Sequence, residues 1–149
     1  MLFRSDSSAF IEIKNSKIYG DNPSPSNFIM FNGTTTPTVI MKNNYIKYDY
    51  NLLYSQPQTT LTLVFKDNIV EQANGGTYGF SVRNGSSVIK ITGNIINNTV
   101  NKSNLIYNNN ISMSNFYVYF NLVKGYTNIA NETDIATITY DYNKLEAVS

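Results

Sequence analysis

The chain has 149 residues, a net charge of +1 and a charged fraction of only 14%. Its length fits one domain, and its balanced charge excludes a broad basic field of the kind that attracts nucleic acid or an anionic membrane. The absence of Cys and His removes disulfides, the usual zinc sites and histidine-activated nucleophiles, so we expect no metal and no cofactor.

From the N-terminus onward, apolar residues occur in short bursts bounded by Asn, Gly, Pro, Ser or Thr, and no segment keeps a helical period. The first residues lack an apolar signal core, and no apolar run approaches the ~18 residues of a membrane-spanning helix. Tyr prefers strands and Asn prefers turns, and both are abundant here. We therefore predict an all-β protein.

An internal repeat favours one all-β architecture. Its form is apolar, any residue, apolar, polar, a turn pair ending in Ser or Asn, and apolar again. The repeat returns at intervals of roughly 20 to 30 residues. The five segments are 11–18, 39–46, 63–69, 89–95 and, more weakly, 111–116, with the turn pairs ending at Ser16, Asn44, Asn68, Asn94 and Asn115.

A second apolar burst lies between successive repeats, at 28–31, 52–54, 78–82 and 105–107, and each leads into a polar turn. One period therefore reads as one coil of a three-sided solenoid, whose coils stack about 4.8 Å apart and bury a continuous apolar column. In such a stack the corner Asn residues are expected to form a ladder, each side-chain amide donating to the next.

These segments resemble the right-handed parallel β-helix proteins, a group that includes pectate-lyase-like enzymes and bacteriophage tailspikes and tail fibres. The resemblance implies a single β-solenoid domain over 1–149, with about five irregular rungs over about 11–120 and a C-terminal strand or cap over about 121–149. The alternative is an antiparallel β-sandwich or jelly roll. Asn32-Gly33, Asn74-Gly75 and Asn84-Gly85 could each form its hairpin turns.

The carboxylates offer only weak catalytic candidates. Glycoside hydrolysis needs two carboxylates across a bond, and Asp67 with Glu71 or Asp49 is the least unsuitable pair. We expect instead that Asp67 is a turn residue and that Glu71 is solvated. No Asp-Asp or Asp-x-Asp cluster is present to hold calcium. The sequence therefore predicts no complete catalytic site within this chain.

Two residue sets are candidates for contact with a glycan. Lys14, Lys42 and Lys66 occupy the same repeat position, with Thr92 and Ser114 next in line, so they predict a row of lysines that either meets an anionic polymer or points into solvent. Exposed aromatic rings beside amides suit sugar binding, whereas partial burial or a subunit contact would be ordinary roles for them. The aromatic candidates are Tyr45, Tyr48, Tyr50, Tyr54, Tyr117 and Tyr119.

By analogy with the resembled proteins, we expect a structural and adhesive virion component, part of a bacteriophage tail fibre, spike or other appendage that contacts host surface glycans. Such appendages imply a homo-oligomer, most simply a trimer, or assembly with other virion proteins outside the cell. Two alternatives stay open: a polysaccharide depolymerase or lyase of the pectate-lyase-like type, and a jelly-roll carbohydrate-binding or decoration protein.

Overall fold

The structure is a computed structural model that describes residues 3–5, 8–20, 27–72, 78–84, 86–107, 115–130 and 138–148. These residues form a parallel β-solenoid in which no helix occurs, and every strand pair is parallel. The predicted all-β solenoid is therefore confirmed. The antiparallel sandwich is wrong, because parallel pairing of strands one period apart leaves no hairpins in the described sheets.

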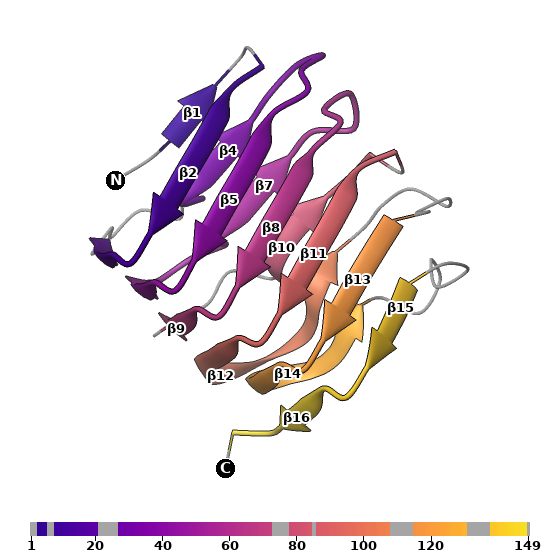
Figure 1. The fold of residues 1–149 in the computed structure, drawn as a ribbon. Coiled ribbons are helices and arrows are strands. Elements are labelled where there is room, and N and C mark those ends of the chain that lie inside the picture. The colour runs from indigo at the N-terminus through magenta and orange to yellow at the C-terminus, as the bar shows by residue number, and fades with distance from the viewer. Residues whose placement is uncertain are drawn as a thin grey trace.

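One side of the solenoid, which we call side one, is a sheet of six strands that lie side by side in chain order (Figure 1). Residues one period apart stand directly opposite one another, as Ile11, Val39 and Leu63 do. The strands are β2 (Phe10–Lys14), β5 (Thr38–Lys42), β8 (Thr62–Lys66), β11 (Val88–Thr92), β13 (Asn115–Tyr119) and β15 (Ile138–Asp141).

A second, ten-stranded sheet forms the other two sides. Side two follows the corner after side one and contains β3 (Lys17–Gly20), β6 (Tyr45–Tyr48), β9 (Ile69–Gln72), the start of β12 (Ile95–Tyr107), the start of β14 (Leu122–Ala130) and β16 (Lys144–Glu146). Side three contains β1 (Phe3–Ser5), β4 (Ile29–Phe31), β7 (Leu53–Ser55), β10 (Tyr78–Val82) and the ends of β12 and β14.

The number of turns differs slightly from the expected five rungs, because the chain makes about four turns between β2 and β13. β14, β15 and β16 then continue the same parallel pairing, so the described part of 121–149 consists of further strands at the C-terminal end. No helix in the described residues is long and apolar enough to cross a membrane.

The core is a column of inward side chains that alternate with outward ones along each strand. Val39, Leu63, Ile89 and Phe116 stack at one register position of side one and are fully buried. Burying each such side chain contributes about 1.5–3 kcal/mol. At the N-terminal end of the stack, Ile11, Ile13 and Ile18 occupy inward positions but are only partly buried.

The corner between sides one and two is a two-residue turn repeated at every period. Its first residue has left-handed backbone, which Asn, Asp and Gly adopt most easily. These residues are Asn15, Asn43, Asp67, Gly93, Phe120 and Tyr142, with φ between 52° and 69°. The second residue turns inward, so its polar side chain must find partners inside the stack.

The second corner residues form the predicted ladder. Each Asn amide nitrogen donates to the Asn oxygen of the following turn, with distances of 2.9, 3.1, 2.9 and 2.8 Å along the series Asn44, Asn68, Asn94, Asn121 and Asn143. Each of these oxygens also accepts the backbone N–H of the ladder residue one turn earlier in the chain. Ser16 begins the series by donating its backbone N–H to Asn44.

The prediction that the fifth turn pair ends at Asn115 is wrong. Asn115 starts β13, and the ladder passes through Asn121 instead. Strands on side one place the ladder residue two positions after the strand end, and β13 ends at Tyr119. Residues 111–114, which include Ser114, lie outside the described residues; Tyr119 follows Thr92 in the row of lysines.

Candidate functional site

The lysine row lies on the outer face of side one, directly before the corner. Register pairs Lys14 with Lys42 and Lys42 with Lys66, and the row then continues through Thr92 to Tyr119. Neighbouring strands are about 4.8 Å apart, so the lysine stems are closely spaced. We call this row the lysine column.

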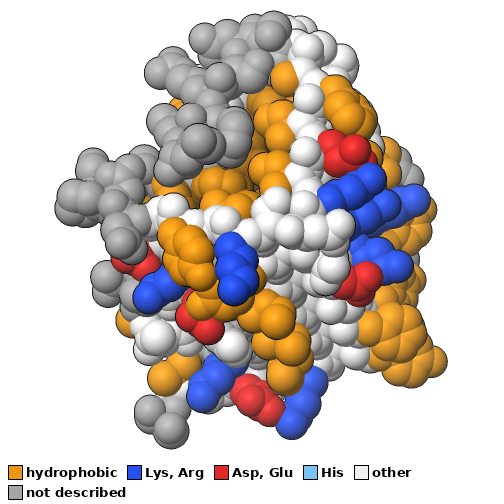
Figure 2. Space-filling view, turned by 60° about the vertical axis from the view of Figure 1, so that its left-hand side comes forward, with side chains coloured by type: hydrophobic (Ala, Val, Ile, Leu, Met, Phe, Trp, Pro, Cys, Tyr) orange, Lys and Arg blue, Asp and Glu red, His pale blue; other side chains and the backbone are white. Residues whose placement is uncertain are grey.

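Two of the three lysines have a carboxylate nearby. Lys14 pairs with Glu12, and Lys66 lies 3.7 Å from Asp67. No ion pair to Lys42 occurs within the described residues. Exposed pairs of this kind contribute little, with a typical value of about 0–1 kcal/mol. The column therefore keeps a local excess of positive charge. Figure 2 shows one face of the molecule, on which basic side chains gather in small groups beside acidic ones.

At the other end of the same edge, Tyr119 continues the lysine column, and exposed aromatic rings occupy the adjacent corner positions. Phe120 and Tyr142 occupy successive corner positions, are 65% and 77% exposed, and stack with ring centroids 5.1 Å apart and planes 6° apart. The ring centroids of Tyr119 and Phe120 are 6.3 Å apart, and Lys90 Nζ lies 5.8 Å from the ring centroid of Tyr117. These four rings, Tyr117, Tyr119, Phe120 and Tyr142, are called the aromatic cluster.

Phe120 and Tyr142 occupy corner positions whose left-handed backbone is unfavourable for aromatic residues. A bulky residue in left-handed backbone is an outlier, and for ordinary L-residues the conformation costs roughly 1–2 kcal/mol. Asn, Asp or Gly occupies the equivalent position at Asn15, Asn43, Asp67 and Gly93. Strained positions that display an exposed side chain are concentrated at functional sites. Phe120 and Tyr142 are not among the predicted contact residues, and only the corner register identifies them.

The predicted tyrosine group 45–54 does not form one surface. Tyr48 is only 1% exposed, with its ring centroid 5.3 Å from that of Phe28, so it belongs to the core and is not a contact residue in this conformation. Tyr50 packs partly against the same core. Tyr45 lies on side two and Tyr54 on side three. Tyr48 lies two residues after buried Ile46 and therefore on the same inward face of β6, which the strand period could have revealed.

The catalytic candidates do not gather into one site among the described residues. Asp67 lies at the corner, while Glu71 lies on side two and accepts a 2.7 Å hydrogen bond from the Tyr45 hydroxyl. That hydrogen bond to Glu71 raises the pKa of Tyr45 above its ordinary value. Asp49 follows β6, and no group of three acidic residues suited to a metal ion occurs in the described part.

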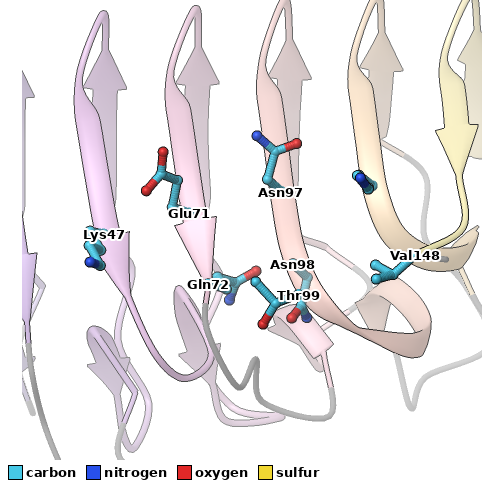
Figure 3. Close-up of a pocket in the computed structure, with 8 residues that line it drawn as sticks. Lys47, Glu71, Gln72, Asn97, Asn98, Thr99 and Val148 are labelled. Atoms are coloured by element: carbon cyan, nitrogen blue, oxygen red, sulfur yellow. The ribbon is translucent and has the colours of Figure 1, made fainter.

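Glu71 instead contributes to an open groove of about 520 Å³ on side two. Figure 3 shows Lys47, Glu71 and Asn97 on three neighbouring strands, with Gln72, Asn98 and Thr99 gathered beneath them. Lys124 and Val148 complete the lining. The column Lys47, Glu71, Asn97 and Lys124 is in register, with Glu146 following Lys124, so lysines lie on both sides of Glu71. The groove offers amides and charges to a polar ligand, and Glu71 is the one carboxylate among its described lining residues.

Beneath this groove lies a buried tyrosine. The Tyr126 hydroxyl donates a 2.8 Å hydrogen bond to Gln72, and burial raises the pKa of Tyr126 to about 12 although the amides of Asn98 and Gln72 act in the opposite direction. This phenol is thus held neutral over the whole physiological range, which suits a structural role.

Neither protein-family models nor the characterised proteins and solved structures gave a significant match to this chain. The parallel β-solenoid is therefore established by the strand pairing alone. The finer resemblance to pectate-lyase-like or tailspike proteins stays a prediction.

Proposed function

We propose that this chain is a structural and adhesive β-solenoid that contacts an acidic surface glycan along the edge between sides one and two. The observation that carries the proposal is that the lysine column continues in register to Tyr119, beside the stacked corner rings of Phe120 and Tyr142. Lysines attract the anionic groups of a polymer, and exposed rings pack against the apolar faces of its sugars.

The stacked geometry also fits an extended ligand. Equivalent side chains recur about every 4.8 Å along the axis, so a polymer lying along the edge meets the same type of contact several times. The free energies of these weak contacts then add, so the affinity should rise with polymer length. A virion appendage, such as a bacteriophage tail fibre or spike outside the cell, is the proposed setting for this adhesive role.

Oligomerisation is part of the same proposal. At the N-terminal end of the stack Phe10 is 67% exposed, and the inward residues Ile11, Ile13 and Ile18 are only partly covered. Among the described residues β2 pairs only with β5, and exposed apolar groups beside a strand edge of this kind favour coverage by another chain. We propose a homo-oligomer, most simply a trimer. Analytical ultracentrifugation should find a species larger than a monomer at micromolar concentration, and a stable monomer would contradict this part.

Binding to immobilised polymers tests the adhesive function. The wild-type protein should bind polygalacturonate or hyaluronate but not neutral dextran, and added salt should weaken the binding. The double variant Lys42→Ser/Lys66→Ser should bind about tenfold more weakly, a change of about 1.4 kcal/mol. Lys102→Ser, which removes a lysine away from this edge, is the matched control.

Three results would contradict the proposal: no binding to either acidic polymer, binding unchanged in the double variant, or an equal loss in the control. Shortening of either polymer during the assay would indicate a depolymerase instead. Because the described carboxylates are separated, the structural role is the better supported of the two functions.

A further inference from the structure

Side three carries an arrangement of side chains that the glycan-binding edge does not use. Tyr54 on β7, Ser81 on β10 and Tyr107 at the end of β12 occupy one register column, with the serine in the middle. A serine between two tyrosines leaves a gap about two strand spacings wide, roughly 10 Å, between the rings.

The guanidinium group of Arg83 fills this gap. Its central carbon lies 5.0 Å from the ring centre of Tyr54 and 5.8 Å from that of Tyr107, within the range of cation–π attraction. Ser81 is buried beneath it. Tyr78 extends the surface by stacking on Tyr107, with ring centroids 4.2 Å apart and planes 17° apart. The arginine is thereby fixed in a framework of three tyrosine rings.

Arg83 has no polar partner in the described part of the chain. No hydrogen bond or ion pair joins its guanidinium to a described residue, and its Nε is buried without an acceptor. The hydroxyl oxygen of Ser81 is also buried without a partner. A partly desolvated cation that lacks a carboxylate is costly, and arginine forms strong, often bidentate bonds with carboxylate and phosphate groups.

We propose that Arg83, Tyr54, Tyr78 and Tyr107 form a binding site for an oxyanion attached to a sugar ring, either the carboxylate of a uronic acid or the phosphate of a sugar phosphate. The guanidinium binds the oxyanion, and a tyrosine ring packs against the sugar. Because this site lies on side three, it does not depend on the lysine column or the aromatic cluster.

NMR titration of the full chain tests this site, with the Arg83 Nε–H signal and the amides of β7 and β10 as reporters. The ligands are glucuronate, glucose 6-phosphate, glucose and inorganic phosphate. We expect saturable shifts with glucuronate or glucose 6-phosphate, and at least about tenfold weaker binding of glucose and of inorganic phosphate. Whichever of the two sugar anions binds more tightly identifies the source of the oxyanion.

Arg83→Lys keeps the charge but loses the planar fork, so it should weaken binding of the sugar anion by about tenfold. Lys102→Ser removes a lysine that belongs to neither proposed site, so it serves as the control and should bind the sugar anion normally. A failure of both sugar anions to shift the Arg83 signal at tens of millimolar would overturn the proposal, and so would equal binding of glucose, equal binding of inorganic phosphate or unchanged binding by Arg83→Lys. If Arg83→Lys does not fold, the wild-type titration still decides between these outcomes.

Discussion

The inner and outer residues of the same corners follow different rules. The inner position holds Asn at Asn44, Asn68, Asn94, Asn121 and Asn143, and each amide before Asn143 donates to the Asn of the next turn. The outer position changes from Asn through Asp and Gly to Phe and Tyr, although the backbone conformation stays left-handed. One position is fixed by buried hydrogen bonding, whereas the other is exposed and varies in chemistry.

This difference indicates where stability and function are separated. An inner residue must both accept two N–H donors and donate to a carbonyl, so few side chains can replace Asn there. An outer residue must only tolerate its backbone conformation, and Phe120 and Tyr142 accept a conformational cost while displaying their rings to solvent. We therefore expect inner substitutions to change stability and outer substitutions to change binding.

Removal of an inner amide should have the largest effect. In Asn94→Ala the buried N–H of Asn68 loses its acceptor, and Asn121 and the Phe65 carbonyl lose a donor. We expect a loss of about 4 kcal/mol in the free energy of unfolding, measured by urea denaturation. Asn43→Gly, an outer substitution that permits the same backbone, is the control and should cost less than about 1 kcal/mol. Equal losses of unfolding free energy in the two variants would contradict the distinction between inner and outer positions.

Deprotonation of Tyr126 should have the next largest effect on the free energy of unfolding. Its pKa is about 12 in the folded protein and ordinarily 10.0, so the folded state holds the proton more tightly. The stabilisation is complete below pH 10 and should be lost between pH 10 and pH 12, up to about 3 kcal/mol. Denaturation measured across this range should show a smaller decline in Tyr126→Phe. An identical decline in both proteins would refute the assignment.

Replacement of an outer ring should change stability only slightly. Phe120→Asn relieves the left-handed backbone but loses the stack with Tyr142, and these opposing contributions are each about 1 kcal/mol. We expect a net change below about 1 kcal/mol in thermal or urea unfolding, together with clearly weaker binding to polygalacturonate or hyaluronate. If stability falls by several kcal/mol, the ring is structural and the separation of roles is wrong.

Replacement of Lys42 should have the smallest effect on stability. This side chain has no ion pair among the described residues and stands between two other lysines. Lys42→Ser should leave the free energy of unfolding within about 0.5 kcal/mol of the wild-type value. A marked loss of stability would show that the lysine column supports the fold.

The sequence predicted the solenoid because the corner pattern repeats with constant chemistry. It correctly identified Ser16, Asn44, Asn68 and Asn94, whose amides and backbone groups are bonded along one line. The prediction of Asn115 was wrong because irregular loop lengths allow both Asn115 and Asn121 to fit the same pattern. The five-residue length shared by β2, β5, β8, β11 and β13 resolves that ambiguity in favour of Asn121.

The candidate site was less predictable than the fold. The lysine column could be predicted because equal repeat positions imply stacking. The inward position of Tyr48 follows from the strand period, but the space for its ring depends on a neighbouring turn. Gly20 stands beside Tyr48, and a Cβ atom there would lie 2.4 Å from the tyrosine ring, so only glycine leaves room for it. The Arg83 site likewise depends on contacts between residues of three different turns.

The most direct test of the central claim is to map an acidic oligosaccharide on the isotopically labelled protein by amide chemical shifts. A ligand that lies along the edge should perturb Lys42, Lys66, Tyr117 and Phe120 together, while the amides of the inner ladder change little. Shifts confined to side two, or no shifts at saturating oligosaccharide, would contradict the proposed role of this edge.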